Sequence, residues 1–270
     1  MVGGKGIKST MQKDAQTASV GLLADNAEEL GKLVAMLRGG AFKPRTSPYS
    51  FQGLGQHGLD IIADVGRTYQ LPVVTEVMSV EQLPSVCDRA DMLQIGSRNM
   101  QNFDLLKAVG RVDKPVMLKR GLSATLEEFV MAAEYILSHG NPNVVLCERG
   151  IRSFDTYTRN VLDLGAVAAL KHIVHLPVIV DPSHASGRRE LVADLARAAI
   201  ACGADGLMVE CHPDPDSSVS DAQQALSLQA TVDLVESLRP IAAAVGRIFP
   251  PSRSGSIPTM ESDSPVSVAA

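Results

Sequence analysis

The residues best suited to chemistry are concentrated in one short stretch that combines three cations with two hydroxyl groups. This stretch, Arg38-Gly-Gly-Ala-Phe-Lys-Pro-Arg-Thr-Ser47, follows an apolar run at 33–37 that predicts a short buried strand. Pro44 fixes φ and removes a backbone donor, so Lys43 and Arg45 are held in a stiff, extended loop. Together with Thr46 and Ser47, they predict a site for a doubly charged oxyanion such as phosphate. A merely solvated basic loop is disfavoured, because adjacent glycines and two prolines suit a constrained turn.

A second group of side chains has the composition of a metal site. His184, Glu210 and Asp221 follow consecutive predicted strands. One imidazole and carboxylates are suitable ligands for Mn²⁺, Fe²⁺, Zn²⁺ or Co²⁺. A lone loop histidine is more often simply hydrogen-bonded, so the prediction depends on the three residues being neighbours in space. Cys211 follows Glu210 directly and is expected on the opposite face of its strand.

The elements that must position these residues alternate along the chain. We predict strands at 33–37, 71–78, 92–95, 115–119, 144–147, 177–180 and 206–209, with a weak candidate at 20–24. We predict helices at 58–69, 80–90, 104–110, 125–139, 164–172, 190–201 and 220–238. Repeated strand–helix units predict an α/β fold with a parallel sheet, and eight of them form a (β/α)8 TIM barrel. The first unit is atypical or truncated, because 20–37 is short for a strand, a crossover helix and a second strand.

The alternative to the barrel is an open doubly wound sheet. The barrel is favoured because it gathers all strand ends around one mouth, and every clearly predicted strand ends in charged or metal-capable residues. The side chains expected at that mouth are Arg38, Lys43, Arg45, Glu76, Arg98, Lys119, Arg149, Asp181, His184, Glu210 and Asp221. The positive members would hold two phosphate-bearing molecules.

Composition excludes several classes of function. A formal net charge of -5, 4% aromatic residues and no tryptophan argue against a nucleic-acid-binding protein. No apolar run reaches the length of a membrane span, and no signal peptide is visible, so we expect a cytoplasmic protein with four reduced cysteines. We expect an atypical N-terminal segment at 1–24, a catalytic barrel at 25–246 and a disordered tail at 247–270.

Six segments in a fixed order resemble 3-deoxy-D-arabino-heptulosonate 7-phosphate (DAHP) synthases of the type I beta branch. They are Arg38–Ser47, Ile95-Gly-Ser-Arg-Asn99, Leu118-Lys-Arg-Gly121, Cys147-Glu-Arg-Gly150, Asp181-Pro-Ser-His184 and Ser220-Asp-Ala-Gln-Gln224. The resemblance implies the first step of the shikimate pathway, which leads to chorismate and the aromatic amino acids. In this step phosphoenolpyruvate and erythrose 4-phosphate condense and phosphate is released.

The resemblance also implies roles for single residues. Arg38, Lys43, Arg98, Lys119 and Arg149 resemble the phosphoenolpyruvate site, and the segment from Lys43 to Thr46 resembles the erythrose 4-phosphate site. Lys43 is shared between the two substrates, Lys119 is a candidate proton donor, and Glu76, Ser47 and Asp181 complete the expected substrate-binding set. His184, Glu210 and Asp221 resemble three of the four ligands of a divalent metal. The expected catalytic residues are Lys43, Lys119 and His184.

The chain departs from the family at its N-terminus. The fourth metal ligand of the family is a cysteine in a Gly-Pro-Cys-Ser motif after the first strand, and this chain has no cysteine before Cys87. Related octulosonate synthases that work without metal have an asparagine there, and no matching motif is visible. We therefore expect weakened metal affinity.

Two other functions remain open. One is 3-deoxy-D-manno-octulosonate 8-phosphate synthase, although that branch has Lys-Ala-Asn-Arg-Thr-Ser where this chain has Pro44 and Arg45. The other is a non-catalytic barrel that binds phosphoenolpyruvate, a reading supported by the missing thiolate. The resemblance further implies a homo-oligomer. No ferredoxin-like module or chorismate mutase domain is visible, so we expect no feedback inhibition within this chain.

Overall fold

The protein forms a ring of parallel strands surrounded by helices, in a computed structural model that describes residues 2–4, 35–44, 47–218 and 221–248. The strands are β1 (Val2–Gly4), β2 (Leu37–Arg38), β3 (Val73–Glu76), β4 (Met92–Ile95), β5 (Val116–Lys119), β6 (Val144–Glu148), β7 (Val178–Val180), β8 (Gly206–Leu207) and β9 (Val209–Cys211). Every strand pair is parallel, and the order in the sheet is β8-β7-β6-β5-β4-β3-β2-β1-β9.

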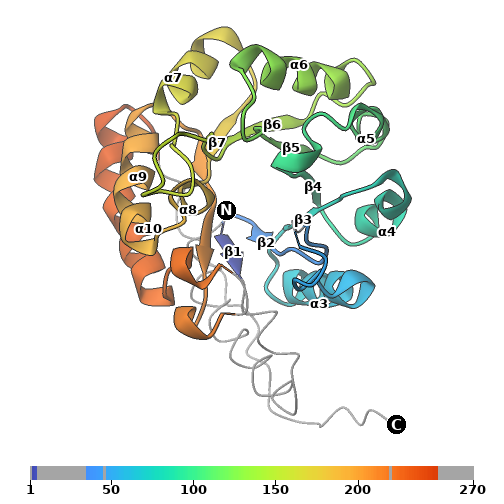
Figure 1. The fold of residues 1–270 in the computed structure, drawn as a ribbon, viewed down its shortest axis with the longest axis horizontal. Helices are drawn as coiled ribbons and strands as arrows, with labels where there is room; N and C mark the ends of the chain where they lie inside the picture. The colour runs from blue at the N-terminus through green and yellow to red at the C-terminus, as the bar shows by residue number, and fades with distance from the viewer. Residues whose placement is uncertain (1, 5–34, 45–46, 219–220, 249–270) are drawn as a thin grey trace.

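The sheet closes because its two end strands are halves of one strand. Only Met208 separates β8 from β9. Gly206 of β8 pairs with Ile179 of β7, whereas Glu210 of β9 pairs with Gly3 of β1. The eighth strand therefore bonds to both ends of the row, and the closed ring confirms the predicted (β/α)8 barrel (Figure 1).

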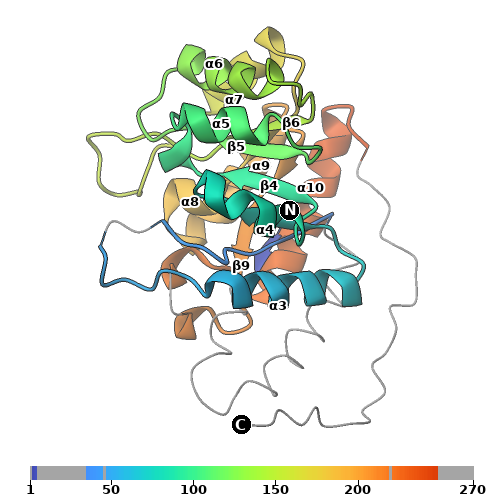
Figure 2. The ribbon, with the colours of Figure 1, turned by 90° about the vertical axis from the view of Figure 1, so that its right-hand side faces the viewer.

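The helices form the outer layer of this ring (Figures 1 and 2). They are α3 (Gly55–Thr68), α4 (Leu83–Cys87), α5 (Phe103–Val109), α6 (Leu126–Leu137), α7 (Leu164–Ile173), α8 (Pro182–Ser186), α9 (Arg189–Ala201) and α10 (Leu228–Ala244). Side-chain caps fix several of their starts: Thr125 and Glu128 form a reciprocal capping box at α6, and Asp163 accepts a hydrogen bond from the Ala166 backbone at α7. None of the helices in these ranges is long and apolar enough to cross a membrane.

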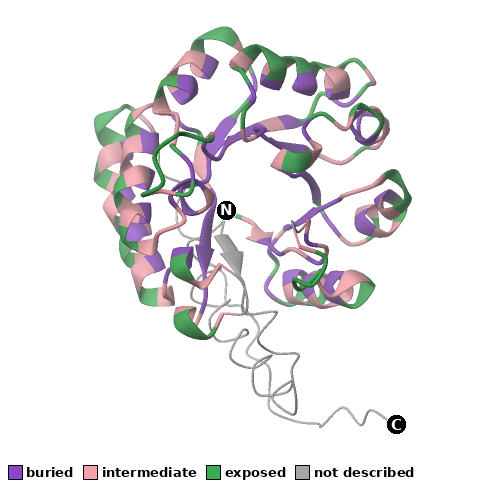
Figure 3. Cartoon of the chain, viewed as in Figure 1, coloured by how far each residue is buried: buried purple, intermediate pink, exposed green. Residues whose placement is uncertain are grey.

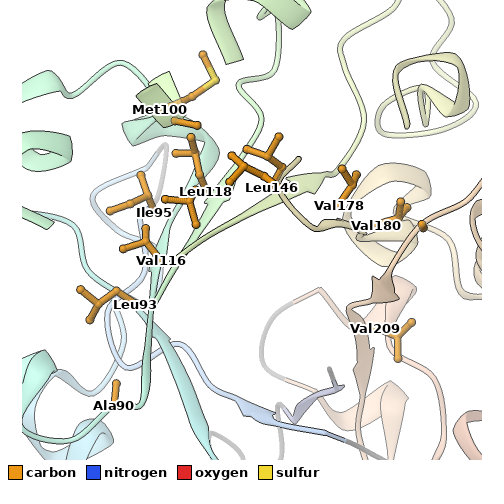
Figure 4. Packing of buried hydrophobic residues seen from close by; sticks show 14 of the residues in the cluster. Ala90, Leu93, Ile95, Met100, Val116, Leu118, Leu146, Val178, Val180 and Val209 are labelled. Atoms are coloured by element: carbon orange, nitrogen blue, oxygen red, sulfur yellow. The ribbon is translucent and has the colours of Figure 1, made fainter. Parts of the chain in front are cut away.

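Alternation along the strands divides the interior into an outer and an inner core. Residues such as Leu93, Ile95, Leu118 and Leu146 belong to a large apolar cluster that includes helix residues (Figure 4). The intervening residues form a separate cluster inside the ring: Val74, Met92, Met117, Cys147, Ile179 and Met208. Figure 3 shows that the strands of the ring are mostly buried and that the outward faces of the helices are exposed. The inner cluster is an apolar floor, and the next inward positions along the strands carry the polar residues of the candidate site.

The first two strands differ from the prediction. The strand expected at 33–37 is β2, which begins only at Leu37 and includes Arg38. The first position in the ring is taken by β1, a glycine-rich stretch for which the sequence indicated nothing. The weak strand candidate at 20–24 and the tail from residue 249 lie outside the described residues.

The predicted helix at 220–238 is wrong at both ends. Asp221 has φ of 55°, a left-handed conformation that a helix cannot include, and Leu226 instead pairs with Cys211 of β9. Helix α10 begins at Leu228, where the Ser227 side chain accepts from the Ala230 backbone, and it continues to Ala244. A helix was also missed: Pro182 starts α8 directly after β7, and Asp181 caps it through the His184 backbone N–H.

Close packing between α3 and β3 predicts a position where one methyl group is harmful. A β-carbon at the buried Gly66 would lie 2.3 Å from Cγ2 of Val73 and 2.9 Å from the carbonyl oxygen of Leu71. We expect Gly66→Ala to lower the free energy of unfolding by about 1–2 kcal/mol, because overpacking exceeds the gain in helix propensity.

The matched control is Gly165→Ala in α7, where the nearest atom is 3.4 Å away. This change should be neutral or raise stability by up to about 1 kcal/mol. Urea unfolding of both variants measures the difference. A Gly66→Ala protein as stable as the wild type would show that α3 does not approach β3 as described.

Candidate active site

A cavity of about 480 Å³ lies at the carboxyl ends of the strands, above the apolar floor. Ten of the residues predicted for the site line it: Arg38, Lys43, Pro44, Ser47, Glu76, Arg98, Lys119, Arg149, His184 and Asp221. Two more, Asp181 and Glu210, are buried and contact His184. The last two, Arg45 and Thr46, lie outside the described residues.

The cavity is strongly positive. Its lining includes seven arginine and lysine side chains but only two carboxylates, those of Glu76 and Asp221. Arg149 is buried, and burial lowers the pKa of its guanidinium, although the Asp181 carboxylate opposes this effect. Such a concentration of cations is stable only with anions close by, so the cavity is suited to ligands that carry phosphate and carboxylate groups.

Asp181 connects the cationic part of the cavity with the histidine. It is fully buried, and its Oδ2 accepts a hydrogen bond from Nζ of Lys119 and lies 2.7 Å from Nδ1 of His184. Burial opposes ionisation, but the charges and hydrogen bonds of His184 and Lys119 outweigh it and hold the pKa of Asp181 well below its ordinary value. Asp181 is therefore a carboxylate that orients the His184 ring and turns Nε2 toward Glu210.

His184 and Glu210 are arranged as two ligands of one metal ion. Nε2 of His184 lies 3.4 Å from Oε1 of Glu210, close to the separation of two atoms that each bind one ion at about 2.1 Å. Burial lowers the pKa of His184, although Asp181 and Glu210 oppose this, and the neutral ring is the form that binds metals. Gln224 Nε2 donates to the other oxygen of Glu210, which is a typical orienting contact.

The third predicted ligand is not brought into this pair. Asp221 lines the same cavity, but its Oδ1 lies 3.7 Å from Nη1 of Arg159. Across 35–44, 47–218 and 221–248, no three His, Cys, Asp or Glu side chains are close enough together to hold a metal ion. Cys211 does not substitute, because it belongs to the outer cluster as predicted, and burial raises the pKa of its thiol to about 12. The residues thus fit a metal through one histidine–glutamate pair.

A buried ion cluster fixes the strand ends that carry Lys119 and Arg149. Nη1 of Arg120 lies 2.8 Å from Oε2 of Glu148 and 3.0 Å from Oδ2 of Asp163, and Oε1 of Glu148 accepts from the Gly150 backbone. Arg120 and Glu148 alternate with the two cavity cations along β5 and β6, so they point to the outer side. These ion pairs connect the ends of β5 and β6 to the start of α7. They therefore help to fix the positions of Lys119 and Arg149.

Sequence reasoning missed several residues of the cavity, and three of them contact predicted site residues. Gln94 lies between Arg38 and Glu76, and the only signal for it was a polar residue inside the apolar strand 92–95. Asn160 donates to the His184 carbonyl oxygen, and Arg159 reaches Asp221 and Gln224. Both belong to the loop before α7, where neither spacing nor periodicity points to the cavity.

The fold and the site define a (β/α)8 barrel with an anion-binding cavity beside a candidate metal pair. Comparison with known proteins identifies its family. The model of the DAHP synthetase I family matches residues 15–243, and the chain belongs to this family.

The relatives include enzymes of two related activities. A phospho-2-dehydro-3-deoxyheptonate aldolase of Thermotoga maritima is 50% identical over 226 residues, which cover 83% of this chain and 67% of that protein. The crystal structure of a Thermotoga maritima DAHP synthase matches with a TM-score of 0.83 and 46% identity, covering 92% of this chain and 70% of that one. A 2-dehydro-3-deoxyphosphooctonate aldolase of Syntrophotalea carbinolica is 32% identical over 248 residues, 87% of this chain and 88% of that protein.

Burial of Glu76 predicts a pH dependence of stability. Burial raises its pKa above the ordinary 4.5, although Arg38, Lys119, Lys43 and Arg98 oppose this. Because the folded protein then binds the proton more tightly than the unfolded chain, the free energy of unfolding falls as pH rises from about 4.5 through the raised value. The Glu76→Gln variant lacks the titrating carboxyl group, so its free energy of unfolding does not fall in this way. The variant should therefore gain stability relative to the wild type as pH rises.

Urea unfolding between pH 4 and pH 8, without substrates, measures the effect. Glu134→Gln, an exposed position on α6, is the control and should follow the wild type. A stability difference between Glu76→Gln and the wild type that stays constant over this range would contradict the raised pKa.

Proposed function

We propose that this chain condenses phosphoenolpyruvate with erythrose 4-phosphate to give DAHP and phosphate, the first step of the shikimate pathway. The observation that carries the proposal is the single cavity in which the family's cations converge above the barrel floor. The 50% identical relative supports this substrate pair over that of the octulosonate branch, whose matching members are 32–35% identical.

In this proposal the cations have separate tasks. Arg38, Arg98, Lys119 and Arg149 bind the phosphate and carboxylate of phosphoenolpyruvate, and Lys43 is shared between the substrates. Pro44, Arg45, Thr46 and Ser47 belong to the erythrose 4-phosphate site. Neutralising both phosphates allows C3 of the enol phosphate to approach the aldehyde carbon in one orientation.

The bond changes follow from that orientation. The C3 electron pair of the enol attacks the aldehyde carbon, and Lys119 donates a proton to the new hydroxyl oxygen. Water adds at C2, and the C–O bond to phosphate breaks, releasing phosphate. Asp181 holds Lys119 in place by accepting a hydrogen bond from its Nζ.

A divalent metal is a general property of the family, and we assign it to the pair of His184 and Glu210; Asp221, the third ligand expected from the resemblance, is not brought close to this pair. When bound, Mn²⁺, Fe²⁺, Zn²⁺ or Co²⁺ would act as a Lewis acid on the aldehyde oxygen. The cysteine of the family's first strand has no counterpart here, so the affinity for metal is expected to be reduced. We also expect a homo-oligomer.

The function is tested by a steady-state assay of phosphate release. With Mn²⁺ present, we expect turnover that requires both phosphoenolpyruvate and erythrose 4-phosphate, and little turnover with arabinose 5-phosphate. Lys119→Met should lower the rate by about 10²–10⁴-fold, because it removes the proton donor and a phosphate contact. Lys107→Met, an exposed lysine on α5 that pairs with Asp104, is the matched control and should keep the wild-type rate.

Preference for arabinose 5-phosphate would assign the chain to the octulosonate branch. No phosphate release with either sugar, while phosphoenolpyruvate still binds, would support a non-catalytic barrel instead.

The metal assignment has its own test in calorimetric titration with Mn²⁺. We expect weak binding that is lost in His184→Ala, because the imidazole is one of few available donors. His139→Ala, at the end of α6, should bind like the wild type. Tight, stoichiometric binding by the wild type would show that another residue has replaced the missing thiolate.

A further inference from the structure

A buried amide joins two oppositely charged residues of the cavity. Gln94 of β4 is 1% exposed, and its Oε1 accepts from Nε of Arg38 at 3.1 Å, while its Nε2 donates to Oε2 of Glu76 at 2.9 Å. Arg38 is on β2 and Glu76 is on β3, so Gln94 of β4 contacts side chains from two other strands. All three side chains line the cavity.

Only an amide fits between these two partners. The guanidinium Nε is a donor without acceptor capacity, and an ionised carboxylate only accepts. Glutamine offers one acceptor and one donor group on the same terminus, so both partners are satisfied by one side chain. An apolar residue of similar volume would fill the space, as Met92 does two residues earlier in the floor, but it would leave Arg38 and Glu76 facing each other.

The amide also keeps the two charges from pairing directly. Nη2 of Arg38 and Oε2 of Glu76 are 3.9 Å apart, which is an ion pair too long for a hydrogen bond, while Nε of Arg38 and Oε2 of Glu76 are each hydrogen-bonded to Gln94. A guanidinium in a direct, bidentate pair with a carboxylate is a poor partner for an incoming anion, because that anion must displace the carboxylate. Gln94 therefore keeps the Arg38–Glu76 pair long, so an incoming anion does not have to break a direct hydrogen bond between them.

We propose that Gln94 is a positioning residue for phosphoenolpyruvate binding: it holds Arg38 in place and keeps it out of a direct hydrogen-bonded pair with Glu76. This inference rests on the proposed function and adds a residue that does not need to touch the substrate. Gln94→Met keeps the volume but removes both hydrogen bonds, so Arg38 and Glu76 can close the gap between them. Gln94→Glu retains an acceptor for Arg38 but supplies a competing carboxylate and repels Glu76.

The test is calorimetric titration of the full chain with phosphoenolpyruvate. We expect Gln94→Met to weaken binding by about 10–100-fold, the range expected when a charged partner loses its orienting hydrogen bond. Gln94→Glu should weaken it further. In the assay, KM for phosphoenolpyruvate should rise by a similar factor, whereas KM for erythrose 4-phosphate and kcat at saturation change by less than about threefold.

Two further variants separate positioning from a general structural role. Gln82→Met, which loses a hydrogen bond to the Met78 backbone at the start of α4, is the matched control and should bind phosphoenolpyruvate like the wild type. In the double variant Gln94→Met with Glu76→Gln, the competing charge is absent, so binding should recover at least partly relative to Gln94→Met alone. A loss caused only by disturbed packing would not be recovered.

Each outcome has a defined meaning. Wild-type affinity in Gln94→Met, or no recovery in the double variant, overturns the inference and leaves the proposed function intact. Failure of the wild-type chain itself to bind phosphoenolpyruvate overturns both. Urea unfolding is measured for every variant, and if Gln94→Met does not fold, unchanged binding by a folded Gln94→Glu overturns the inference in the same way.

Discussion

The constraint on which the site depends is the alternation of side chains in a closed parallel sheet. Each strand places every second residue inside the ring, so eight short strands produce stacked layers of inward-facing side chains. The lower layer is apolar, with Met92, Met117 and Met208 among its members. The layer above it contains Arg38, Glu76, Gln94, Lys119, Asp181 and Glu210, which are charged or amide side chains and all buried. Charge can be concentrated there because the layer opens into a cavity on one side only.

Buried charges of this kind are costly unless each has a partner. The barrel satisfies this requirement with groups that come from different strands. Lys119 of β5 pairs with Asp181 after β7, and Arg120 pairs with Glu148 of β6 on the outer side. Arg38 is held by Gln94. In each case the partner comes from a different strand, so closing the sheet brings each charged group to its partner.

The site divides into two parts that differ in how completely they are formed. The anion-binding part is built from β2 to β6 and has cations on several sides of the cavity. The candidate metal part is built from the end of β7 and from β9, where His184 and Glu210 approach each other and Asp181 and Gln224 orient them. Between the two parts of the ring lies β1, which hydrogen-bonds to β2 and β9.

The sequence by itself determined the class of fold and most members of the site. Alternating strand and helix signals are local, and Lys119, Arg149 and His184 follow within a few residues of apolar runs that could be recognised without any long-range information. The tertiary structure decided what local patterns do not contain. The residues of β1 pair only because two other strands leave a place for them, and Asp221 cannot belong to the last helix because its backbone takes a left-handed turn. Gln94 became a site residue for the same reason: its partners are 56 and 18 residues away, and only the pairing of three strands brings them together.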